Sequence, residues 1–250
     1  MEAFIAIFLP YALLLARISA FFAVLPVFGW QTVPMTVRAG IALVVTVFFA
    51  YHATPTFGPM QAHWLSAVVL LVGEVICGLA LGLAANFVFL AVQQGGHIIV
   101  QQMGFAESGI IDPTTGEETE TLAVLLETAF VVLFLAAGGH HVLLTVLSAS
   151  YRMFPVGQGP DTGALAGGLV AAGSTMLLFA LKLAAPALAA FLILAVVLAV
   201  VARVLPDMNV LLESFPLRVA LGLFIAAAIM PSLNSFVTDL TDWMSRFLIA

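Results

Sequence analysis

Residues 95–121, GGHIIVQQMGFAESGIIDPTTGEETET, form the longest interruption in an otherwise apolar sequence. The stretch holds five acidic residues and no Lys or Arg, yet it keeps apolar side chains at Met103, Phe105, Ile110 and Ile111. A plain solvent loop does not need these apolar residues, and a membrane helix does not tolerate the Pro and Gly that follow Asp112. Irregular backbone survives at membrane depth only where protein lines a cavity. We therefore interpret the stretch as a constriction or plug in a pore.

The composition is that of an integral membrane protein or of a subunit of a very apolar assembly. Of the 250 residues, 63% are hydrophobic and 8% are charged, whereas soluble domains are about 45–50% apolar and about 25% charged. A formal net charge of -6 lacks the basic footprint of a nucleic-acid-binding protein. The single cysteine, Cys77, excludes a disulfide framework within the chain and metal clusters of the Cys type.

Apolar runs separated by turn signals predict an all-α chain. The runs cover residues 4–28, 39–51, 64–92, 122–147, 165–201 and 210–230, and a short amphipathic stretch follows at 237–248. Glu2 stands where the positive region of a cleavable signal belongs, so we expect the first run to be a retained membrane helix. Residues 148–163 are predicted to form a loop, and the run after it contains Pro186 and is too long for one straight crossing.

Three ionisable residues, Arg17, Glu74 and Lys182, lie inside apolar runs. A charge at a bilayer centre costs roughly 2.5–3.5 kcal/mol even on the lenient insertion scale, so such residues face a bundle interior, a water-filled cavity or a partner. They could serve an ion pathway or form buried ion pairs that fix assembly. Because no repeated Asp/Glu/His ladder accompanies them, the sequence favours buried ion pairs. Basic residues are spread evenly over the loops and predict no orientation, which suggests helices packed mainly against partner chains.

Small residues at helical spacing, including Gly78 and Gly82, indicate close helix packing. His140 and His141 are adjacent in a Gly-containing break, and no Cys or carboxylate at ligand spacing supports a metal site there. The acidic group at residues 117–120 lacks the spacing of a calcium loop. Neither a phosphate-binding Gly loop nor a nucleophile elbow is present. We therefore expect no enzyme activity, no catalytic residue, no metal and no cofactor.

Several short motifs share a specific order. The first group comprises Arg17, Pro26, Pro34, Arg38, Gly73-Glu74, Gly78 and Gly82. The middle group comprises Gln102-Met103-Gly104, Asp112-Pro113, Phe134-Leu135, Gly139-His140-His141, Ser150 and Pro155-Val156-Gly157. The last group comprises Ala202-Arg203, Pro206, Asn209 and Phe215-Pro216-Leu217-Arg218. In this order and nearly end to end, the chain resembles the FliR family of flagellar export-gate proteins, whose virulence counterparts are called SpaR or SctT.

The resemblance implies a subunit of the export gate that joins FliP and FliQ around a narrow channel for unfolded substrates. FliR looks like a fusion of these two partners, so the resemblance implies kinked helical hairpins, with a FliP-like part at 1–163 and a FliQ-like part at 164–250. It implies a bacterial inner-membrane location in the flagellar basal body, with lipid, FlhA-like and FlhB-like proteins, rod-type proteins and export substrates as further partners, and no nucleic acid.

The resemblance also implies two sets of functional residues. The plug set contains Met103, Gly104, Phe105, Gly109, Ile110, Ile111, Asp112 and Pro113. The set of buried polar or assembly residues contains Arg17, Arg38, Glu74, Lys182, Arg203, Asn209, Pro216 and Arg218, with a bend expected at Phe215-Pro216. Three alternatives stay open at this point: a virulence-system counterpart, a secondary transporter of small solutes, and a purely structural assembly chain.

Overall fold

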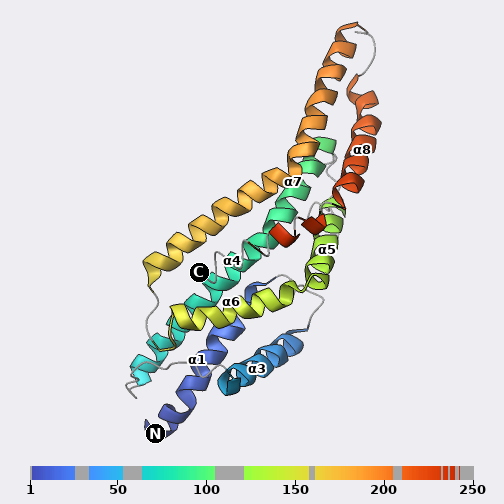
Figure 1. Cartoon of the computed structure of the whole chain (residues 1–250). Coiled ribbons are helices and arrows are strands. Elements are labelled where there is room, and N and C mark those ends of the chain that lie inside the picture. The colour runs from blue at the N-terminus through green and yellow to red at the C-terminus, as the bar shows by residue number, and fades with distance from the viewer. Residues whose placement is uncertain are drawn as a thin grey trace. The chain divides into compact units, whose positions relative to one another are not determined.

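The computed structural model describes residues 2–25, 34–52, 64–104, 121–157, 161–204, 210–231, 233–235, 237–239 and 242. The elements of this part are α-helices (Figure 1), so the prediction of an all-α chain is confirmed. They are α1 (Glu2–Val24), α3 (Met35–His52), α4 (Trp64–Met103), α5 (Thr121–Ala136), α6 (Gly139–Met153), α7 (Thr162–Val204) and α8 (Val210–Ile229).

The two longest helices exceed a single membrane crossing. α4 has 40 residues and α7 has 43, whereas about 20 apolar residues cross a hydrocarbon core about 30 Å thick. By length and composition α4 and α7 each qualify as a membrane span. Two bent pairs, α5 with α6 and α8 with the short helix after it, could supply one more span each. The protein is thus an all-α membrane protein in which parts of the longest helices extend beyond a bilayer core.

The described helices form two compact units, and α4 and α7 each contribute to both. In the first unit, α1 packs against α3 and the first part of α4. The buried side chains of α1 recur every three or four residues along one face, as an amphipathic packing pattern requires. They include Leu13, Leu14, Arg17, Ile18 and Phe21. A charged residue is therefore part of the core of this unit.

Two glycines of α4 let its backbone approach α1 closely. A Cβ added to Gly78 would overlap the backbone oxygen of Arg17 and the Cβ of Ala20. A Cβ on Gly82 would lie 2.8 Å from the backbone oxygen of Phe21. Real Cβ atoms do not occupy such positions without a shift of the neighbouring backbone, so the predicted packing role of this glycine pair is confirmed by the geometry.

The second unit joins the remainder of α4 and α7 with α5 and α8. Phe89 of α4 lies between Phe130 and Phe134 of α5, with ring centroids 5.8 and 5.0 Å away. A Cβ on Gly95 of α4 would lie 2.8 Å from Leu183 of α7, so these helices also touch closely. In Figure 1, α7 changes direction partway along its length, and α8 runs in the opposite direction to the end of α7.

Several predicted boundaries are wrong, and tertiary packing explains the differences. The break expected to begin at Gly95 begins after Met103, because Gly95 packs closely against Leu183 and Ala180 of α7 and remains helical. The loop predicted for 148–163 is helical as far as Met153. Pro216 lies inside α8 and not at the bend expected at Phe215-Pro216. The apolar run predicted at 165–201 forms α7, which contains Pro186. Pro disfavours helix interiors but does not forbid them.

Enlarging the α1–α4 contact should destabilise the chain. Gly78→Ala and Gly82→Ala should each lower the apparent melting temperature of the detergent-solubilised chain, since overpacking costs about 1–3 kcal/mol. Gly40→Ala in α3 is the matched control, because a Cβ there has nothing within 4 Å. This control should be neutral or slightly stabilising, since Gly costs about 0.5–1 kcal/mol against Ala inside a helix. Equal melting temperatures for all three variants would contradict the close contact.

Candidate functional site: a buried ion-pair cluster

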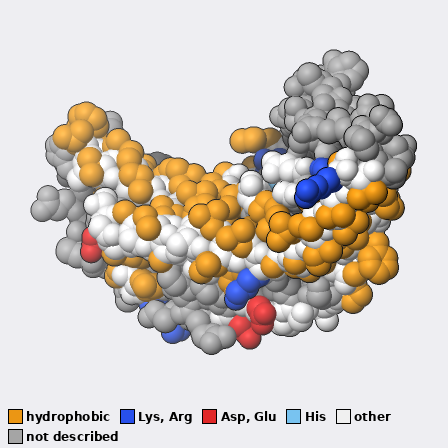
Figure 2. Space-filling view, turned by 90° about the horizontal axis from the view of Figure 1, so that it is seen from above, with side chains coloured by type: hydrophobic (Ala, Val, Ile, Leu, Met, Phe, Trp, Pro, Cys, Tyr) orange, Lys and Arg blue, Asp and Glu red, His pale blue; other side chains and the backbone are white. Residues whose placement is uncertain are grey.

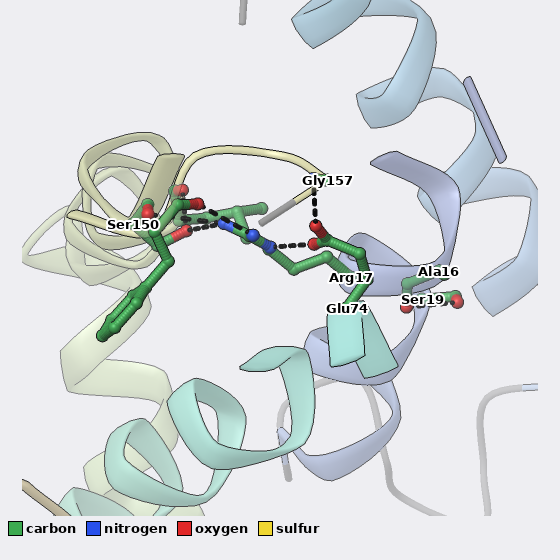
Figure 3. Close-up of polar contacts among 8 residues, drawn as sticks. Ala16, Arg17, Ser19, Glu74, Ser150 and Gly157 are labelled. Atoms are coloured by element: carbon green, nitrogen blue, oxygen red, sulfur yellow. Dashed lines mark hydrogen bonds and ion pairs between the residues drawn. The ribbon is translucent and has the colours of Figure 1, made fainter. Parts of the chain in front are cut away.

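Arg17 and Glu74, which lie 57 positions apart in the chain, form a buried ion pair in the first unit (Figure 3). Arg17 comes from the middle of α1 and Glu74 from α4, and their side chains are 1% and 2% exposed. The Nε–H of Arg17 donates to Oε2 of Glu74 over 2.6 Å. Charge-assisted bonds of this kind are short and about twice as strong as neutral ones. The pair ties α1 and α4 together beside the contact made by Gly78.

The rest of the Arg17 guanidinium caps the C-terminal end of α6. Nη1 donates to the backbone oxygen of Ser150 over 3.3 Å, and Nη2 donates to the backbone oxygen of Phe154 over 2.9 Å. The last carbonyls of a helix lack intrahelical partners and carry the negative end of its dipole. The Ser150 oxygen also accepts the Phe154 N–H over 2.8 Å, so the guanidinium adds a second hydrogen bond there and supplies one to the Phe154 oxygen. The guanidinium is itself stabilised by the negative end of the dipole. Arg17 therefore fixes where α6 ends as well as where α4 lies.

The second oxygen of the Glu74 carboxylate holds the turn after α6. The backbone N–H of Gly157 donates to Oε1 of Glu74 over 3.1 Å. Gly157 has φ +82°, a left-handed backbone that glycine adopts without a Cβ penalty. The preceding side chain, Val156, is fully buried. Both carboxylate oxygens are thus engaged, one by a side chain and one by the backbone.

Tyr151 completes the cluster, and the sequence did not identify it. Its ring centre lies 4.6 Å from Cζ of Arg17, within the range of a cation–π contact. The ring also lies 5.8 Å from that of Phe49 in α3. Its hydroxyl is buried without a hydrogen-bond partner among the described residues. The available signal was the placement of an aromatic residue directly after Ser150 of the motif, which is weak without knowledge of the fold.

The arrangement is suited to holding helices in place. Each buried ion loses several kcal/mol of hydration, which only good geometry and further hydrogen bonds offset. Here Arg17 and Glu74 have four kinds of fixed partner between them: each other, helix-end carbonyls, a turn N–H and an aromatic face. This geometry supports the interpretation of Arg17 and Glu74 as a buried structural pair. Four motif residues, Arg17, Glu74, Ser150 and Gly157, converge in the cluster.

The other predicted assembly residues lie outside this cluster. Lys182 and Arg203 are exposed on α7, so the predicted pairing of Lys182 across helices or subunits stays a prediction. The Lys182 ammonium lies 5.1 Å from the centre of the Phe179 ring. Arg38 of α3 and Arg218 of α8 are half-buried, and Pro216 is exposed. Asn209 lies outside the described residues.

The structure describes only the beginning of the predicted plug. Met103 ends α4 with its side chain 1% exposed, packed where a Cβ on Gly222 of α8 would strike it. Gly104 follows with φ +86° and donates its N–H to the backbone oxygen of Gln101 over 3.1 Å, a left-handed ending that favours glycine. These two residues end α4 at a defined point. The remaining predicted plug residues, Phe105, Gly109, Ile110, Ile111, Asp112 and Pro113, lie outside the described residues.

The adjacent histidines do not build a metal centre. The rings of His140 and His141 lie with their centres 4.1 Å apart, closer than the divergent directions expected of neighbours on a regular helix, because α6 begins there after a turn. In the part of the chain that the structure describes, no group of three or more His, Cys, Asp or Glu side chains is placed to hold a metal ion.

The fold and the cluster define a class: an all-α membrane protein with a buried Arg–Glu pair that clamps three helices and a turn. The chain belongs to family 1 of the bacterial export proteins, whose sequence pattern matches residues 8–244. The resemblance drawn from the ordered motifs is confirmed by this match.

Flagellar biosynthetic proteins and a Yop proteins translocation protein are similar to the chain over most of their length. The flagellar biosynthetic protein FliR of Bacillus subtilis is 31% identical over 226 residues, which cover 89% of this chain and 86% of that protein. The protein of the same name from Escherichia coli is 30% identical, covering 90% of this chain and 86% of that protein. The Yop proteins translocation protein T of Yersinia pestis is 29% identical, covering 86% and 83%.

Removing one member of the buried pair should be more damaging than removing an exposed polar group. Glu74→Ala leaves the Arg17 guanidinium buried without its counter-charge, which typically costs about 3–5 kcal/mol. The apparent melting temperature of the solubilised chain should fall by roughly 6–20 °C, at about 2–4 °C per kcal/mol for a chain of this size. Gln94→Ala, at an exposed position of the same helix, should leave it unchanged. A Glu74→Ala variant as stable as Gln94→Ala would contradict the cluster's structural role.

Proposed function

We propose that this chain is a subunit of a flagellar type III export gate in the bacterial inner membrane. In this proposal it forms, with FliP-like and FliQ-like subunits, a channel through which unfolded export substrates pass. The observation that carries the proposal is the convergence of Arg17, Glu74, Ser150 and Gly157 in one buried cluster. These are motif residues of the export-gate resemblance, and the chain belongs to a family of bacterial export proteins. The cluster would hold the first unit rigid within the assembly.

The surface supports a role in an assembly of several chains. Large apolar side chains are exposed along α3, α4, α7 and α8, and Figure 2 shows hydrophobic side chains over much of the face that it draws. In an apolar 18-residue segment of α7, only 17% is buried within the chain. Soluble monomers rarely expose apolar patches larger than a few hundred Å², so this surface requires cover by lipid and by other proteins.

We propose that residues 105–113 plug the closed channel. Gly104 supports this, because its left-handed backbone ends α4 at a fixed point directly before the proposed plug. The buried Met103 provides an anchor for that point. Apolar side chains in a narrow pore block ions by excluding water. The division into a FliP-like part at 1–163 and a FliQ-like part at 164–250 belongs to the same proposal, as do contacts with FlhA-like, FlhB-like and rod-type proteins.

A strain that lacks the gene distinguishes the flagellar, virulence and transporter alternatives by the function that it loses. Similarity to both FliR and the Yop translocation protein T is compatible with a virulence apparatus as well as a flagellum. The transporter alternative has less support, because Arg17 and Glu74 are held by fixed partners and present no free relay. Their arrangement favours a structural role.

The proposal predicts that a deletion of the gene abolishes motility and export of flagellar proteins to the medium. The wild-type chain supplied from a plasmid should restore both, and a tagged chain should copurify with FliP-like and FliQ-like proteins. Motility unaffected by the deletion, with loss of injected virulence proteins instead, would assign the chain to the virulence system. Export intact in both systems would overturn the proposal.

The same strain tests the plug. A chain lacking residues 105–111 should still copurify with its partners, because the helices on either side make the packing contacts. Cells carrying it should leak small ions, measured by loss of membrane potential. Normal copurification without added leakage would show that this segment is not the plug.

A further inference from the structure

Lys182 is an exposed cation in the middle of the apolar helix α7. It lies 20 residues after Thr162 and 22 residues before Val204, so about 30 Å of helix extends on either side of it at 1.5 Å per residue. Lysines near helix ends reach the membrane surface with their long side chains, but this one is far from both ends. Its contact with the Phe179 ring at 5.1 Å stabilises the ammonium only in part.

A second polar group lies beside it in the backbone. Pro186 lies inside α7 and has no N–H, so the backbone oxygen of Lys182, four residues earlier, lacks its helical donor. Lys182 and Pro186 are both exposed in this chain. The apolar face of α7 therefore carries one charged donor group and one backbone acceptor within a single turn.

The residues that flank this spot form a surface suited to another helix. Ala185 and Ala189 are exposed four residues apart, and small residues at this spacing let a second backbone approach closely. Large exposed side chains border them, with Leu178 60% exposed on one side and Leu192 67% exposed on the other. Small residues in the middle of this face, with large residues before and after them along the helix, form a surface on which a second helix can pack.

We propose that this face of α7 binds an apolar helix of a different subunit, one that places an Asp or Glu opposite Lys182. The inference rests on the proposed function, in which the chain works among other subunits. Charge complementarity selects the occupant, because a buried ammonium requires a carboxylate partner. A second copy of α7 is excluded as that partner, since the helix contains Lys182 and Arg203 and no Asp or Glu along its 43 residues.

Lipid alone does not satisfy this face. If Lys182 lies at the depth of the hydrocarbon core, its counter-charge must come from protein. If it lies at the membrane surface, about 30 Å of apolar helix on one side lies outside the core and needs protein cover. Both placements require a protein on this face of α7.

The test uses the full chain in its own cells, with a photoreactive amino acid in place of Ala189. Irradiation should produce an adduct with another membrane protein, at a helix with an acidic residue within two turns of the linked position. Lys182→Met should lower the adduct yield about tenfold or more, as expected for truncating one partner of a buried charge pair. Leu181→Met, at the neighbouring exposed position, is the control and should leave the yield unchanged.

A charge exchange protects the test against a variant that folds poorly. Lys182→Glu should lose the adduct, and Lys182→Glu combined with the partner's acidic residue changed to Lys should restore it. Adducts with phospholipid alone, adducts with a second copy alone, or an undiminished yield with Lys182→Met would each overturn the inference. If export still depends on the chain, such a result would overturn only the inference about Lys182 and leave the proposed function intact. If export does not depend on the chain, both the inference and the proposed function would be overturned.

Discussion

A guanidinium buried away from water needs oxygen acceptors in fixed directions. The acceptors of the Arg17 guanidinium come from other elements of the first unit, and these contacts organise that unit. The carboxylate of Glu74 accepts from Nε, and the backbone oxygens of Ser150 and Phe154, at the end of α6, supply the remaining acceptors. Glu74 in turn receives the N–H of Gly157. The position of one side chain in α1 thereby determines the approach of α4, the end point of α6 and the path of the turn that follows.

This arrangement combines a polar clamp with apolar close packing. Gly78 and Gly82, about one and two turns after Glu74, bring α4 within backbone contact of α1. In an apolar solvent the hydrophobic effect does not drive helices together, so close packing and specific polar contacts have to do so. The two features require each other: a larger residue at Gly78 would separate the helices, and the Arg17–Glu74 distance depends on that separation.

The sequence predicted much of this organisation and failed where tertiary contacts decide. The all-α class followed from apolar runs, and the burial of Arg17 and Glu74 followed from the cost of a charge in such a run. Their mutual contact could not be derived, since 57 residues separate them and no local pattern reports on distant pairs. The helical state of Gly95 was missed because contact with α7 overrides the weak helix propensity of glycine. Lys182 is exposed within the single chain, so of the environments predicted for it the described residues leave a cavity or a partner.

A double-mutant cycle on the solubilised chain tests most directly whether Arg17 and Glu74 act as one unit. The measurement is the apparent unfolding free energy of Arg17→Met, Glu74→Met and the double variant. Each single change leaves a buried charge without its partner, whereas the double change removes both charges and is often tolerated. The account predicts a double variant more stable than either single one, with a coupling of roughly 0.5–3 kcal/mol. If the decrease in unfolding free energy of the double variant equals the sum of the decreases of the two single variants, the pair does not hold the helices together.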